Sequence, residues 1–389
     1  VNARLVEAAQ DRQVWAESYR RQLTAENLFE IQSELTEEIA AKLQAQLTPE
    51  ELRAGRQLPT RNLDAYRLYV EGLRHLEQWT EEEMRQAAES FQRALDCDPD
   101  YALAWAGLAD ALSLLRWYGF AEPEGAPTPE AASRRAVELA PDLAEAHLSR
   151  AIVLSSSRLS DGPRALREFE EAIRLQPSLA IAYVWMGWLH LLMGSPEQAV
   201  GPAEQAVELD PLAPQARVFL AEIYLARGET EAALREAIRA RELQPEKPFC
   251  HYIEALALYH LGRLSEARAV LEETLTLAPP IEQMPTHSQI NALLAVVKAA
   301  LGDSNGARGL SGEIDAQADP FSAGLLHAAL GEQREALQAF DRVRDWGQLS
   351  IEHLRYFFPE VLGPLRDSTQ FKEFLRRADQ SWGARQGRG

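Results

Sequence analysis

The spacing of prolines constrains the fold of this chain more than any other feature of its sequence. Six prolines recur at intervals of 42, 36, 34, 34 and 34 residues, at Pro99, Pro141, Pro177, Pro211, Pro245 and Pro279. Proline has no amide hydrogen to donate and breaks an α-helix when it falls inside one. A period of about 34 residues indicates supersecondary units that stack on one another. The sequence therefore predicts a repeat array.

Small residues recur at two fixed places before these prolines. Five residues before each stand Ala94, Ala136, Ala172, Ala206, Ala240 and Thr274, and seven residues further back stand Ala87, Pro129, Ala165, Ala199, Ala233 and Ala267. Spacings of four and three, as in Ala165, Phe169 and Ala172, place side chains on one face of a helix. We therefore expect a helix before each proline, with small residues where a second helix crosses it.

A second helical pattern precedes each of these helices, as in Tyr183, Met186, Gly187 and His190. Glycines then follow at equal spacing and indicate turns, at Gly194, Gly228 and Gly262. The recurring order of aromatic, Leu, Gly or Ala, and Tyr, then Ala, Phe and Pro, resembles the tetratricopeptide repeat, a helix-turn-helix unit of 34 residues. The resemblance divides the chain into units near 65–101, 102–143, 144–179, 180–213, 214–247, 248–281, 288–316 and 317–345.

This resemblance implies an all-α fold over residues 65–345, a right-handed α-solenoid of about eight helix pairs. A single pair cannot bury its own apolar face, so neighbours stack and the array coils around a concave wall. Such a wall is the usual binding surface of repeat proteins. We interpret residues 346–389 as a capping segment and tail.

The amino-terminal residues have a different pattern. Residues 1–20 alternate in polarity through Leu5 and Trp15, which predicts a β-hairpin, and residues 24–47 form an amphipathic helical pattern with Thr24 as its N-cap. This run resembles the end of a TolB-like α/β domain that precedes tetratricopeptide arrays in bacterial regulators. The resemblance implies that residues 1–55 are the remainder of a truncated domain, in a protein attached to a cyclase, kinase or winged-helix effector.

Composition excludes several classes of partner. A formal charge of -19 would repel a phosphate backbone, and no basic patch offsets it, so we expect no direct nucleic-acid binding. The longest apolar stretch, 182–193, is too short to span a membrane. Cys97 and Cys250 are the only cysteines and suggest neither a disulfide framework nor a thiolate metal site. We expect a cytoplasmic protein without cofactor or metal.

The sequence holds no pattern typical of an active site. It lacks a Gly-rich phosphate loop, a His-Glu-x-x-His motif, a nucleophile elbow and a Cys-x-x-Cys pair. Its histidines fall singly on the repeat helices, which is typical of packing residues rather than metal ligands. We therefore predict no catalytic residues and no enzyme.

The apolar side chains of the first helices are the sequence feature that indicates a binding site. By resemblance to the repeat family, the second, fifth, sixth, ninth, twelfth and thirteenth places of each first helix face the concave groove. Between residues 180 and 260 this places in a partner-binding groove Ile181, Val184, Trp185, Trp188, Leu192, Val218, Phe219, Phe249, Tyr252, Leu256 and Tyr259. The alternative is that these side chains pack between neighbouring helices, because interface and core aromatics look alike in sequence.

These patterns favour a scaffold or sensor module that binds a protein segment, a peptide or helix, in the groove and regulates an effector domain. Two other classes stay open, a homodimerising structural module and an enzyme whose site assembles across several repeats. The groove could also be occupied by this same chain, through helix 24–47 or the aromatic end 346–371.

Overall fold

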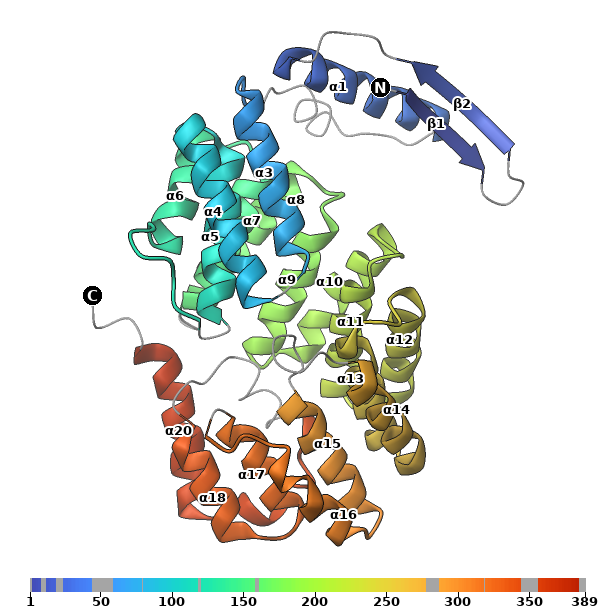
Figure 1. Ribbon diagram of the computed structural model, residues 1–389, viewed down its shortest axis with the longest axis vertical. Helices are drawn as coiled ribbons and strands as arrows, with labels where there is room; N and C mark the ends of the chain where they lie inside the picture. The colour runs from blue at the N-terminus through green and yellow to red at the C-terminus, as the bar shows by residue number, and fades with distance from the viewer. Residues whose placement is uncertain are drawn as a thin grey trace.

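The computed structural model describes residues 2–7, 12–18, 24–43, 59–78, 80–117, 120–157, 161–277, 287–317, 319–343 and 356–384. Figure 1 shows a curved stack of helices with a small hairpin and one helix at the amino-terminal end. Strand β1 (Asn2–Glu7) pairs antiparallel with β2 (Arg12–Ser18), with Leu5 opposite Trp15. Helix α1 (Ala25–Leu43) follows, and its Thr24 side chain accepts a hydrogen bond from the Asn27 amide at 3.2 Å. The predicted continuation to Leu47 lies outside the described residues.

Eight helix pairs succeed one another in the described part of the chain. They are α3 (Leu63–Leu76) with α4 (Glu81–Cys97), α5 (Ala102–Trp117) with α6 (Pro129–Leu139), α7 (Ala144–Ser157) with α8 (Gly162–Leu175), α9 (Ala180–Leu192) with α10 (Pro196–Leu209), α11 (Pro214–Ala226) with α12 (Thr230–Leu243), α13 (Pro248–His260) with α14 (Leu264–Leu277), α15 (His287–Ala300) with α16 (Ser304–Gly309), and α17 (Pro320–Ala329) with α18 (Gln333–Arg342). The predicted all-α solenoid is confirmed.

The periodic prolines separate one pair from the next. Helices α4, α6, α8, α10 and α12 each end two residues before such a proline, and the first helix of the following unit begins three residues after it. A residue that precedes proline is pushed out of the helical region, and the proline itself cannot donate to the helix. The spacing seen in the sequence is therefore the spacing of helix ends.

Glycines make the turn inside each pair. Gly194, Gly228 and Gly262 have φ angles of 74°, 76° and 71°, a left-handed conformation that side chains with a Cβ atom rarely adopt. The Gly194 amide donates to the carbonyl of Leu191 at 2.9 Å, and the Ser195 amide donates to that of His190 at 2.9 Å. These bonds satisfy the last carbonyls of α9 and reverse the chain toward α10.

The small residues lie where the two helices of a pair approach most closely. A Cβ atom added to Gly187 on α9 would lie 3.1 Å from the backbone oxygen of Ala199 on α10. The side chains of Ala199 and Ala233 are fully buried. Close helix crossing leaves no volume for a larger side chain at these places.

We expect Ala199→Leu and Ala233→Leu each to lower the free energy of unfolding by about 1–3 kcal/mol, because the added atoms overpack the crossing. Urea or thermal unfolding measures this change. Ala269→Leu on the exposed face of α14 is the control and should leave stability nearly unchanged. If Ala199→Leu unfolds like the parent, the crossing does not need a small side chain there.

The carboxyl-terminal helix α20 (Thr369–Ala384) packs against the last pair of the array. Its Phe371 and Phe374 rings lie 5.9 Å and 5.1 Å from the ring of Phe340 on α18. All three side chains are buried. The helix thus covers an apolar face of α18.

Candidate partner-binding groove

The first helices α9, α11 and α13 stand side by side and form the wall on which the sequence places the groove. Most of the predicted lining is buried, namely Val184, Trp185, Trp188, Leu192, Val218, Phe219, Tyr252, Leu256 and Tyr259. Ile181 is 36% exposed and Phe249 is partly exposed. The structure therefore brings these residues together on adjacent helices. Their contact with a partner stays a prediction.

Aromatic rings connect this wall across three units. Trp185 on α9 lies 5.8 Å from Trp117, at the end of α5, and 6.1 Å from Phe219 on α11. Trp188 meets Phe219 edge to face at 5.0 Å. Edge-to-face contacts of this kind add to the apolar burial of each ring and hold neighbouring units in register.

A segment from the far end of the chain lies against the same wall. Tyr356 packs on both the cluster around α9 and the cluster around α13, and its hydroxyl lies close to the turn at Gly194. Phe357 and Phe358 are fully buried. Part of the aromatic end thus packs on the clusters around α9 and α13, and its occupancy of the groove stays a prediction. Residues 346–355 of that end lie outside the described residues.

The contact between this segment and α13 is also polar. The His260 ring donates a hydrogen bond to the backbone carbonyl of Phe357, and burial lowers the pKa of His260. Burial, followed by the nearby charge of Glu360, raises the pKa of Tyr259 to about 12. His260 therefore remains neutral at physiological pH and acts as a hydrogen-bond donor to the segment.

Glu222 stands at a groove place of the repeat but is not among the groove residues predicted from the sequence. It occupies the ninth place of the unit 214–247, equivalent to Trp188 in the preceding unit, and it is fully buried. Neither of its carboxyl oxygens has a hydrogen-bond partner among the described residues, and burial raises its pKa to about 8. Its charge acts on Tyr252 of α13. A lone acidic residue among apolar groove places was the signal in the sequence.

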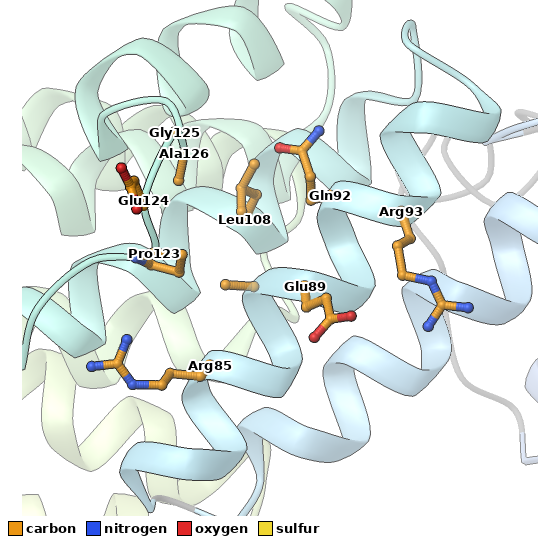
Figure 2. Close-up of a pocket in the computed structure, with 10 residues that line it drawn as sticks. Arg85, Glu89, Gln92, Arg93, Leu108, Pro123, Glu124, Gly125 and Ala126 are labelled. Atoms are coloured by element: carbon orange, nitrogen blue, oxygen red, sulfur yellow. The ribbon is translucent and has the colours of Figure 1, made fainter.

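A cavity lies between α4 and the loop that connects α5 to α6. Figure 2 shows the loop residues Pro123 to Ala126 facing α4 across a cavity of about 340 Å³. Arg85 and Arg93 line it together with Glu89 and Glu124, and Arg85 already pairs with Glu81 at 2.7 Å. Two cations and two carboxylates balance, so this cavity favours no class of ligand.

The described residues contain no group of three or more His, Cys, Asp or Glu side chains placed to hold a metal ion. No helix among them is long and apolar enough to cross a membrane.

Two family models match the chain. Residues 150–214 match the tetratricopeptide repeat, and residues 193–274 match a model described as subunit 3 of the anaphase-promoting complex, or cyclosome. No curated protein matches the chain. These matches, within residues 150–274, support the description of the chain as a tetratricopeptide repeat protein. Proteins of this fold generally mediate protein–protein interaction and are generally not enzymes.

Solved structures of low sequence identity resemble parts of the array. The thermophilic repeat protein TTC0263 of Thermus thermophilus is 21% identical, over 50% of this chain and 99% of its own, with a TM-score of 0.43. The protein PilF of Pseudomonas aeruginosa is 16% identical over 62% and 96%, with a TM-score of 0.45. YrrB, described as having an unusual peptide-binding site, is 20% identical over 49% and 94%, with a TM-score of 0.34.

Proposed function

We propose that this array is an interaction module that binds an apolar segment of another protein along the wall of α9, α11 and α13. The observation that supports the proposal is the packing of the chain's own segment, Tyr356 to Leu362, on the clusters around α9 and α13. A surface that accepts one aromatic segment offers the shape and chemistry for another of similar composition. The partner segment and the chain's own segment would then compete.

Competition follows from the covalent connection between the segment and the array. A tethered segment has an effective concentration in the millimolar range, so it occupies the wall even when its intrinsic affinity is weak. A partner must displace it, or bind tightly enough to shift that equilibrium. The buried aromatics of the wall would become accessible only when the segment leaves.

We further propose, from the amino-terminal elements, that binding to the array regulates an effector domain. The β1–β2 hairpin and α1 resemble the end of a TolB-like domain, of the kind that precedes repeat arrays in bacterial regulators. In such a protein, the exchange of the chain's own segment for a partner would be passed to an effector domain in the bacterial cytoplasm. Solution measurements of the array test the binding step first.

We expect a labelled synthetic peptide with the sequence of residues 356–366 to bind the Tyr356→Ala chain at least about tenfold more tightly than the parent. The substitution weakens the chain's own segment and leaves the wall intact. Fluorescence anisotropy with the full chain measures both dissociation constants. Tyr356→Phe, which keeps the ring, should behave like the parent.

A peptide with the same residues in scrambled order controls for nonspecific apolar binding. If the peptide binds neither chain, the wall does not accept segments in trans and the proposal fails. Equal affinity for the parent and Tyr356→Ala would show that the bound segment does not compete for the peptide site.

A further inference from the structure

The first helices α3, α5 and α7 carry several polar side chains at the places that the repeat assigns to the groove. We call these side chains the acidic recess; they are Tyr66, Tyr69, Asp110, Ser113, Glu145 and Ser149. Asp110 on α5 forms a side-chain hydrogen bond with Ser149 on α7. The charges of Glu145 and Asp110 both act on the Tyr69 hydroxyl of α3. The recess therefore joins side chains from three successive units.

The two carboxyls of the recess are desolvated without a compensating cation. Burial raises the pKa of Asp110 to about 7 and also raises the pKa of Glu145. No Lys or Arg of the described residues contributes to either shift. Removing a carboxylate from water without a cation is unfavourable.

Carboxylates elsewhere on the array differ in this respect. Glu130 pairs with Arg116 at 2.6 Å, and Glu236 pairs with Arg217 at 2.6 Å. Lack of a cation is therefore not a general consequence of the strong negative charge of the chain. It distinguishes Asp110 and Glu145 from carboxylates of similar partial exposure.

Two hydrogen-bond acceptors in the recess are unused. Ser113 is 2% exposed, and its Oγ has no hydrogen-bond partner within the described residues. The Oδ1 atom of Asp110, one helical turn away on the same face of α5, also has none. A buried polar atom without a partner costs about 1–3 kcal/mol, which a ligand able to donate hydrogen bonds would recover.

An ammonium or guanidinium group fits this set of atoms. It carries several donors and no acceptor, so it can meet a carboxylate oxygen and a hydroxyl oxygen together. The faces of Tyr66 and Tyr69 attract cations as well, and the Tyr69 ring is held by Tyr101 at 5.3 Å between centroids. An anion would be repelled by two carboxyls, and an apolar group would leave the acceptors unmet.

We propose that the acidic recess binds a lysine or arginine side chain of the partner segment. The inference rests on the proposed function only in taking the ligand to be part of a protein. The groove would then have two unlike halves, an aromatic wall at α9 to α13 that holds apolar residues and a recess at α3 to α7 that holds a cation. Such a division would select both the composition and the direction of a bound segment.

Binding of a cation should strengthen as the pH rises from about 6 to about 8. Asp110 is largely protonated below its pKa of about 7 and attracts a cation only after losing its proton. The titratable groups that face it are Glu145 on α7 and the tyrosines Tyr66 and Tyr69 on α3. The pKa of Glu145 is raised in the same direction, and burial raises the pKa of Tyr69, which therefore remains neutral over this range.

The test uses the full chain, with N-acetyl-lysine methylamide and N-acetyl-arginine methylamide as the cationic probes. The uncharged N-acetyl-norleucine methylamide is their control. Carbon-13 NMR of the labelled Asp carboxyls, assigned with Asp110→Asn, follows the ionisation of Asp110. We expect a cationic probe to lower the pKa of Asp110 by about one unit, a tenfold change in proton affinity, and norleucine to leave it unchanged.

Matched variants separate the recess from the overall charge of the protein. Glu145→Gln should weaken probe binding at least about tenfold, whereas Glu138→Gln on the exposed face of α6 should not change it. The proposal is overturned if the pKa of Asp110 stays unchanged when either cationic probe is added at tens of millimolar. It is also overturned if Glu145→Gln and Glu138→Gln weaken probe binding equally. Comparison of the two probes tells which cation the recess prefers.

The outcome is independent of the peptide experiment with residues 356–366. Cation binding with no competition by that peptide would support the acidic recess as a cation site and rule out the aromatic wall as a binding site. Competition by the peptide without cation binding would support the aromatic wall as a binding site and rule out the acidic recess as a cation site.

Discussion

Trp188→Ala is expected to lower the free energy of unfolding by about 3–5 kcal/mol, the cost of removing a large buried aromatic. Trp188 is 2% exposed and packs edge to face on Phe219 at 5.0 Å. The cavity left behind would lie between two units, so the loss should appear in the cooperative unfolding of the array. Chemical unfolding followed by circular dichroism measures it.

Ile181→Ala on the same helix is the matched control. Its side chain is 36% exposed, so we expect a loss within about 0.5 kcal/mol. If Trp188→Ala unfolds like the parent, the ring contributes little to the folded chain. A parent-like melt with loss of binding of the peptide 356–366 would instead support its role as a partner anchor.

The stability of the parent should fall as the pH rises from about 5 to about 8, and Glu222 should account for a large part of the fall. Its pKa is raised from 4.5 to about 8 by burial. Between these values the folded chain binds a proton that the unfolded chain has lost, so the free energy of unfolding decreases by up to about 1.4 kcal/mol per pH unit. The full effect is on the order of 5 kcal/mol and is complete above the folded pKa.

Glu222→Gln should remove this contribution, because the amide does not ionise. Asp110, Glu145 and Glu254 are also raised and shift stability in the same direction, so the parent and the variant must be compared at each pH. Urea unfolding at intervals across this range gives both slopes. Identical slopes would show that the Glu222 carboxylate is stabilised in the folded chain by a group that balances its charge.

Most of the fold could be predicted from the local conformational preferences of a few residue types. A proline just after a helix cannot continue it, glycine permits a left-handed turn, and alanine leaves room at a helix crossing. Pro211, Gly194 and Ala199 therefore each indicate one local feature of the repeat. Their recurrence predicted the helix pairs, and the hydroxyl of Thr24 predicted the start of α1. These signals act over a few residues and can be read from one sequence.

The candidate site was only partly predictable from the sequence. The repeat positions predicted which residues of α9, α11 and α13 lie together, but the burial of Trp188 and Tyr252 depends on what covers them. The seating of Tyr356 beside Gly194 joins positions more than 160 residues apart in the chain. The period of the repeat contains no information about where a segment outside it will lie.

The sequence by itself determined which helices form, where they end and which faces meet, because those outcomes follow from backbone geometry and from the spacing of apolar side chains. Only the tertiary structure decided which polar groups are left without partners. The sequence places Glu222 and Asp110 on first helices but does not show how deeply they are buried; the stacking of neighbouring first helices removes water from them and supplies no cation. Desolvation depends on the sum of all surrounding atoms, and that sum exists only after the units have assembled.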